Sequence, residues 1–137
     1  MARILALDYG KKRTGIAVTD PLKIIAQGLT TVDTQDLFEF LKAYISSEAT
    51  ERIVIGLPFN LDGSPTDSTA AIQHCIRRLK NTFPDIPVTP VDEAHTSRMA
   101  SKAMVEMGMK KKDRQKKGML DEIAATIILQ EYLNFTS

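Results

Sequence analysis

The stretch RILALDYGKKRTGIAVTD, residues 3–20, contains two apolar runs separated by a short basic turn. The first run is almost continuous and ends at Asp8, a pattern that favours a central strand buried on both faces. A tight turn at Gly10 leads to a second strand at 15–20, and the β-branched run at 24–32 predicts a third. Because the links between these strands are short, the sequence predicts an antiparallel meander.

After the meander the pattern changes to alternating helices and strands. Asp33 or Thr34 can cap a first helix. Its apolar face would contain Leu37, Phe38, Leu41 and Ile45. A buried strand is predicted at 52–57 and a short one at 87–91.

Three further helices are expected. Ser64 and Pro65 are typical of the start of the first of these, which buries Ile72, Cys75, Ile76 and Leu79. The next runs from Thr96 or Ser97 to Met107, and the last has Leu120, Ile123, Ala124, Ile127 and Ile128 on one face. The order predicts an α/β fold, a five-stranded mixed sheet with helices on both faces, in one domain spanning 1–137.

Length and composition are those of a globular protein. The chain has 137 residues, of which 43% are hydrophobic and 26% charged. No apolar run approaches the ~20 residues that a membrane span requires. The single cysteine, Cys75, cannot form an internal disulfide, as expected in a reducing cytoplasm.

The charge is clustered, although its sum is only +1. A basic turn contains Lys11, Lys12 and Arg13, and a longer basic segment contains Lys110, Lys111, Lys112, Arg114, Lys116 and Lys117. Both clusters could contact a phosphate backbone, and ordinary solvated charge is the alternative.

Three carboxylates stand where strands end or helices begin. Asp8 closes the first strand, Glu93 follows the last strand, and Asp121 opens the final helix. Carboxylates that are brought together repel unless a cation neutralises them, and oxygen ligands favour Mg²⁺ or Mn²⁺. Two such ions about 4 Å apart can promote hydrolysis of a phosphodiester. The alternative is that each acid is a helix cap or a surface charge.

Four blocks of the sequence together resemble one family. They are LDYGKKRTGIAVTD at 7–20, IGLPFNLDGS at 55–64, VDEAHTS at 91–97 and DEIAATIILQEYL at 121–133. Their order and content resemble the YqgF (RuvX) family over essentially the whole chain. The resemblance implies an RNase H-like fold and nuclease activity, either in processing the 5′ end of pre-16S rRNA or as a Holliday-junction resolvase. Its acidic triad, carried over by motif, is Asp8, Glu93 and Asp121, which would hold the metal.

The chain departs from the family pattern after Glu93. The family usually has arginine and then an apolar residue, where this chain has Ala94 and His95. His95 could orient water or contact phosphate in place of the arginine, or be ordinary polar surface. Asp20, expected near Asp8, and Asn60 are further auxiliary candidates, for which roles in turns are the alternative.

The facing direction of the last helix separates two adjacent acids. With the apolar face given above, Asp121 would lie roughly 90° from the buried direction and Glu122 roughly 170° from it, facing water. We therefore expect Asp121, and not Glu122, to join the site.

Two other classes of function share some of these features. Sugar-kinase or actin-like ATPases also have an aspartate-x-glycine loop after a strand, but they use two related domains, and this chain has no repeat of LDYGKKRTG. The other alternative is a non-enzymatic RNA-binding module. The sequence leaves open whether the substrate is RNA or DNA, and whether the protein is a monomer or a homodimer.

Overall fold

The computed structural model describes residues 2–20, 22, 25–57, 69–92 and 117–136, and for residues 92, 117–121, 135 and 136 it describes the backbone alone. Its strands are β1 (Arg3–Tyr9), β2 (Arg13–Thr19), β3 (Ala26–Asp33), β4 (Thr50–Leu57) and β5 (Val88–Asp92). Its helices are η1 (Thr34–Asp36), α1 (Leu37–Ser47), α2 (Thr69–Thr82) and α5 (Lys117–Thr136).

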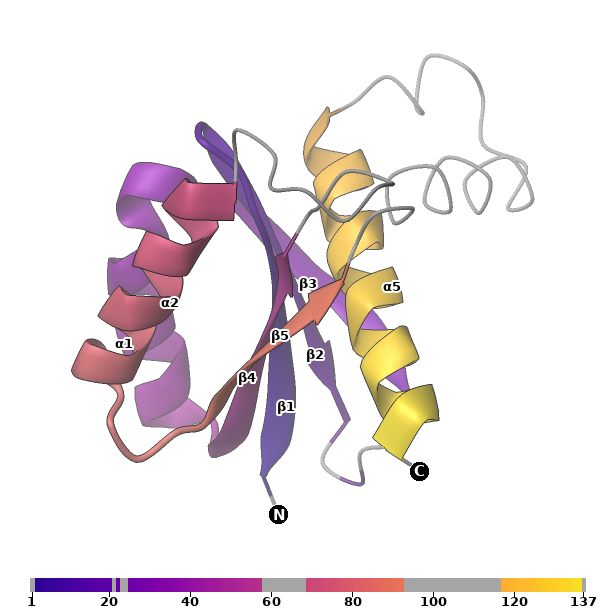
Figure 1. The fold of residues 1–137 in the computed structure, drawn as a ribbon. Helices are drawn as coiled ribbons and strands as arrows, with labels where there is room; N and C mark the ends of the chain where they lie inside the picture. Colours follow the sequence, from indigo (N-terminus) through magenta and orange to yellow (C-terminus); the bar gives the residue numbers. More distant parts are fainter. Residues whose placement is uncertain (1, 21, 23–24, 58–68, 93–116, 137) are drawn as a thin grey trace.

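The five strands form one mixed sheet in the order β3-β2-β1-β4-β5. β1, β2 and β3 pair antiparallel, and β4 and β5 continue the sheet parallel to β1. Helices α1 and α2 cover one face of the sheet and α5 covers the other (Figure 1). The predicted meander, mixed sheet and two helical layers are confirmed.

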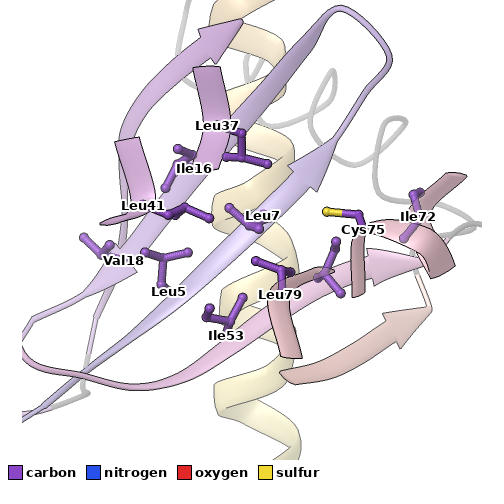
Figure 2. Packing of buried hydrophobic residues seen from close by; sticks show 11 residues of the cluster. Leu5, Leu7, Ile16, Val18, Leu37, Leu41, Ile53, Ile72, Cys75 and Leu79 are labelled. Carbon is purple, nitrogen blue, oxygen red and sulfur yellow. The ribbon is translucent and has the colours of Figure 1, made fainter. Parts of the chain in front are cut away.

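β1 is buried on both faces, as its continuous apolar run predicts. Leu5 and Leu7 join the core beneath α1 and α2, whereas Ile4 and Ala6 join the core beneath α5. Figure 2 shows Leu5 and Leu7 beside buried side chains of the two helices, among them Leu37, Leu41, Cys75 and Leu79. Period-two alternation along the strand therefore fills both cores.

The start of the first helical segment differs from the prediction. Asp33 makes no side-chain capping hydrogen bond, and a 3-10 turn, η1, precedes α1. The hydroxyl of Thr34 instead donates to the carbonyl oxygen of Gly10, in the β1–β2 turn. Asp33 therefore occupies the N-cap position of η1 as predicted, but neither Asp33 nor Thr34 supplies the predicted side-chain cap, because the Thr34 hydroxyl bonds to the β1–β2 turn.

The buried face of α5 also differs from the prediction. Its buried residues are Ala124, Ala125, Ile128 and Leu129, while Ile123 and Ile127 are only partly buried. Glu122 does not face water as predicted. Its Cβ would lie 3.7 Å from a Cβ placed on Gly28, so this part of α5 packs over β3. The helix is rotated relative to the predicted orientation.

Two predicted features lie outside the described residues, namely the helix from Thr96 or Ser97 to Met107 and the helix start at Ser64 and Pro65. Within the described part of the chain, no helix is both long and apolar enough to cross a membrane.

Candidate active site

The carboxyl ends of three parallel strands meet at one edge of the sheet. β1 is parallel to β4, and β4 is parallel to β5, with Leu7 paired to Ile55 and Leu57 paired to Asp92. Asp8 is the next-to-last residue of β1 and therefore lies at this edge. Ligands of open α/β sheets commonly bind beyond such carboxyl ends.

Asp8 belongs to the face of the sheet that α5 covers. The alternation that sends Ile4 and Ala6 into the core beneath α5 places Asp8 on the same side. Its neighbours in the sheet are glycines on both sides. Gly15 pairs with Asp8 directly, and Gly56 stands one residue beyond the Leu7–Ile55 pair. The positions directly beside the half-buried Asp8 in both adjacent strands are therefore glycines.

Helix α5 crosses this face with its amino-terminal half toward the same edge (Figure 1). Glu122 and Thr126 lie over Gly28, which is paired with Ala17 of β2, and Ala17 is paired with Ala6 of β1. The first turns of α5 precede this level. These turns extend from the level of Ala6 toward the edge of the sheet. Asp8 lies at that edge, two residues after Ala6 in β1. Because Ala124 and Ala125 are small and buried, the helix packs closely on the sheet.

The basic turn lies at this edge too. Lys11 and Lys12 are exposed between β1 and β2, and Arg13 begins β2 opposite Asp33. Two positive side chains therefore stand in solvent only three and four residues after Asp8.

Asp20 is not near Asp8, and this prediction is wrong. The β1–β2 register pairs Leu5 with Val18, which puts Asp20 level with Arg3. Five residues along β1 then separate it from Asp8, about 16 Å. Its carboxylate accepts hydrogen bonds from the backbone N–H groups of Leu22 and Ile25, at 3.2 and 2.8 Å. Asp20 thus closes the β2–β3 turn at the opposite end of the sheet.

The remaining candidates are outside what the structure describes. They are Glu93, Asn60, His95, Lys110, Lys111, Lys112, Arg114 and Lys116, together with the side chains of Lys117 and Asp121. Among the residues that are described, no group of three acidic, histidine or cysteine side chains is placed to hold a metal ion.

Two nucleophilic groups near the edge belong to the core beneath α1 and α2. Burial raises the pKa of the Cys75 thiol to about 11, and the nearby Arg78 guanidinium opposes this shift. Burial also raises the pKa of Tyr9, and the neighbouring Cys75 adds to that effect. Both groups are therefore protonated at neutral pH, so neither supplies an anionic nucleophile.

Two features of this edge could not be predicted from the sequence. The glycines at 15 and 56 flank Asp8 only because of the strand register, which the sequence does not specify. The bond from Thr34 to Gly10 joins residues that are 24 positions apart. In the sequence, Thr34 is marked only by its place after a strand and before a helix, and that place predicts a helix cap.

The fold is RNase H-like, and two solved structures share it. The Fowlpox virus resolvase, solved with Holliday junction DNA, gives a TM-score of 0.58 at 14% identity, covering 97% of both chains. RuvC of T. thermophilus, solved with a Holliday junction substrate, gives a TM-score of 0.57 at 14% identity. The match covers 99% of this chain and 97% of RuvC.

The chain belongs to the RuvX family, whose model is described as Holliday junction resolvase and matches residues 2–135. A relative from Bacteroides thetaiotaomicron is 53% identical over 97% of this chain and 96% of its own length. A relative from Flavobacterium johnsoniae is 51% identical over 98% and 97%. Both carry the name "Putative pre-16S rRNA nuclease".

Proposed function

We propose that this chain is a metal-dependent endonuclease that hydrolyses phosphodiester bonds in structured nucleic acid, with the 5′ end of pre-16S rRNA as its substrate. The observation that carries the proposal is the position of Asp8. It stands at the edge where β1, β4 and β5 end, between two glycines and on the face that α5 covers. Membership of the RuvX family and the names of its relatives support the same activity.

Glu93 is the second proposed member of the site. Val91 of β5 packs with the core beneath α5. Alternation continued for two residues would bring residue 93 to that same face, one step past the end of β5. This side of the sheet is the one on which Asp8 stands.

Asp121 is the third proposed member. The buried face of α5 in the structure supports this assignment more strongly than the buried face predicted from the sequence. The buried residues Ala124, Ala125, Ile128 and Leu129 define the direction toward the sheet. With 100° between successive residues, position 121 lies about 10° from that direction, whereas position 122 lies about 90° away. We infer that Asp121 points at the sheet near Asp8.

A divalent cation fits this set of donors. Carboxylate oxygens are hard ligands of the kind that Mg²⁺ and Mn²⁺ prefer, and three carboxylates in one place need positive charge between them. Asp8, Glu93 and Asp121 would hold this cation together with a second one. When bound, such ions would supply an activated water and would stabilise charge on the leaving oxygen.

The positively charged residues would fix the position of the nucleic acid on the protein through contacts with its phosphates. Lys11 and Lys12, in solvent beside the edge, are placed to contact phosphates, as Arg13 and the basic segment 110–117 would be. We assign His95 to a phosphate contact in place of the usual arginine, and Asn60 to the substrate side of the same edge. Such contacts bind the backbone without reading its sequence.

A second substrate, the four-way DNA junction, is favoured by the RuvX family description and by the two resolvase structures. Cleavage of a two-fold symmetric junction would call for a homodimer, whereas cleavage of one rRNA strand needs only a monomer.

The deciding experiment compares the two substrates under one set of conditions. Pre-16S rRNA fragments that span the 5′ processing site and four-way DNA junctions are incubated with the protein and Mg²⁺ or Mn²⁺. We expect faster cleavage of the rRNA. Preference for the junction would replace rRNA with DNA as the substrate. Binding of the rRNA fragment without cleavage of either substrate under any metal condition would support an RNA-binding module instead.

A further inference from the structure

Thr34 holds the β1–β2 turn through three hydrogen bonds. Its hydroxyl oxygen lies 2.6 Å from the carbonyl oxygen of Gly10 and 2.9 Å from the hydroxyl oxygen of Thr14. Its backbone N–H donates to the carbonyl oxygen of Lys12, at 2.9 Å. The first residue after β3 is thus fixed to both ends of the turn that follows β1.

The direction of these bonds is determined by the groups themselves. The carbonyl oxygen of Gly10 can only accept, so the Thr34 hydroxyl donates its single proton there. The Thr14 hydroxyl must then donate to the Thr34 oxygen. Thr14 is fully buried, so this chain of two hydroxyls satisfies a polar group that water does not reach.

The turn itself is tight. A Cβ on Gly10 would lie 2.5 Å from the carbonyl oxygen of Arg13, which no other residue could tolerate without a shift of the backbone. Lys11 and Lys12 project into solvent from between these two residues. Their backbone position is therefore set by the Gly10–Arg13 contact on one side and by Thr34 on the other.

We propose that Thr34 is a positioning residue, whose hydroxyl fixes the β1–β2 turn so that Lys11 and Lys12 meet the phosphate backbone beside Asp8. The inference rests on the proposed function, because it assumes that nucleic acid binds at this edge. Without the hydroxyl, the Gly10 carbonyl and the Thr14 hydroxyl lose their partner, and the turn gains alternative positions. Phosphate contacts would then form only at an additional entropic cost.

The test measures binding and salt dependence for four forms of the full chain. Thr34→Val removes the hydroxyl but keeps the shape and the backbone N–H, and Thr34→Ser retains the hydroxyl. Thr50→Val is the matched control, because the Thr50 hydroxyl donates to the nearby Glu48 carbonyl oxygen at the opposite end of β1 and β4. Binding of a pre-16S rRNA fragment is measured between low and high salt, and KM and kcat are measured on the same fragment.

We expect Thr34→Val to bind about fivefold more weakly, the factor that corresponds to one net hydrogen bond. Its salt slope should fall by about 1, the amount associated with one phosphate contact. KM should rise while kcat stays near the wild-type value. Thr34→Ser and Thr50→Val should bind like the wild type.

A double-mutant cycle separates positioning from a general loss of structure. In protein that carries Lys11→Ala and Lys12→Ala, Thr34→Val should cause no further loss of binding, because the side chains it positions are absent. An equal loss in both backgrounds would overturn the proposal. If Thr34→Val does not fold, Thr34→Ala, which cannot crowd the turn, takes its place in the cycle.

The two proposals fail in different ways. A wild-type protein that binds no nucleic acid would overturn the proposed function and this inference together. A wild-type protein that binds and cleaves, while Thr34→Val keeps the same affinity and salt slope, would overturn the role of Thr34 alone.

Discussion

At the scale of single residues, the surroundings of Asp8 distinguish it from an ordinary surface acid. The positions directly beside Asp8 in the adjacent strands are Gly15 and Gly56. Asp8 also lies at the edge of the sheet where the parallel strands β1, β4 and β5 end. Asp20 lies at the opposite end of the sheet, where its carboxylate closes a turn by accepting hydrogen bonds from two backbone N–H groups.

Two neighbouring acids on α5 provide a test at this scale. Asp121→Asn should abolish metal-dependent cleavage, because an amide does not neutralise a cation as a carboxylate does. Glu122→Gln makes the same chemical change one residue away, over Gly28 of β3, and should stay within a few-fold of the wild type. Cleavage rates with Mg²⁺ and Mn²⁺ check both. The reverse order of effects would mean that the first turn of α5 meets the sheet in another orientation.

Sequence alone could place Asp8 but not Asp20 or Thr34. Asp8 follows four buried residues. A local pattern of that kind predicts a strand end whatever the pairing of the strand with its neighbours. The position of Asp20 depends on the β1–β2 register, because an antiparallel strand returns to the other end of the sheet. The role of Thr34 depends on a contact with Gly10 that no local pattern encodes.

At the scale of elements, α5 shows where periodicity fails. Apolar residues surround the helix, since Ile123 and Ile127 lie opposite Ala125 and Leu129. Several buried faces are then compatible with the sequence, and close packing of two alanines on the sheet selects one of them. β1 has no such ambiguity, because both of its faces are buried.

The basic segment is tested by its effect on salt dependence. Changing Lys110, Lys111 and Lys112 together to glutamine should flatten the salt slope of binding by roughly 2 to 3, at about 0.7–0.9 for each phosphate contact. The affinity for unrelated sequences should fall by similar factors. Binding measured over a range of salt concentrations gives both quantities.

A control with the same change of charge uses Lys42, Arg77 and Lys80, which are exposed on α1 and α2 on the other face of the sheet. Their replacement by glutamine should leave the slope close to that of the wild type. Equal slopes for the two triple variants would show that the segment 110–117 contributes only general charge.

At the scale of the whole molecule, the antiparallel meander, the mixed sheet and the two helical layers follow from patterns that the sequence displays. Continuous apolar runs, short links and alternation of helix with strand predicted them, and the structure confirms them. The fold brings the ends of β1 and β5 and the start of α5 to one edge, although more than a hundred residues separate Asp8 from Asp121. The proposed site therefore exists only in the folded chain.

The most direct test of the central claim is cleavage of the pre-16S rRNA fragment by wild-type protein and by Asp8→Asn, each with Mg²⁺, with Mn²⁺ and with excess chelator. Thermal unfolding of the variant confirms that it is folded. We expect cleavage by the wild type only when metal is present, and none by Asp8→Asn under any of the three conditions. Cleavage in excess chelator, or an unchanged rate for Asp8→Asn, would contradict it.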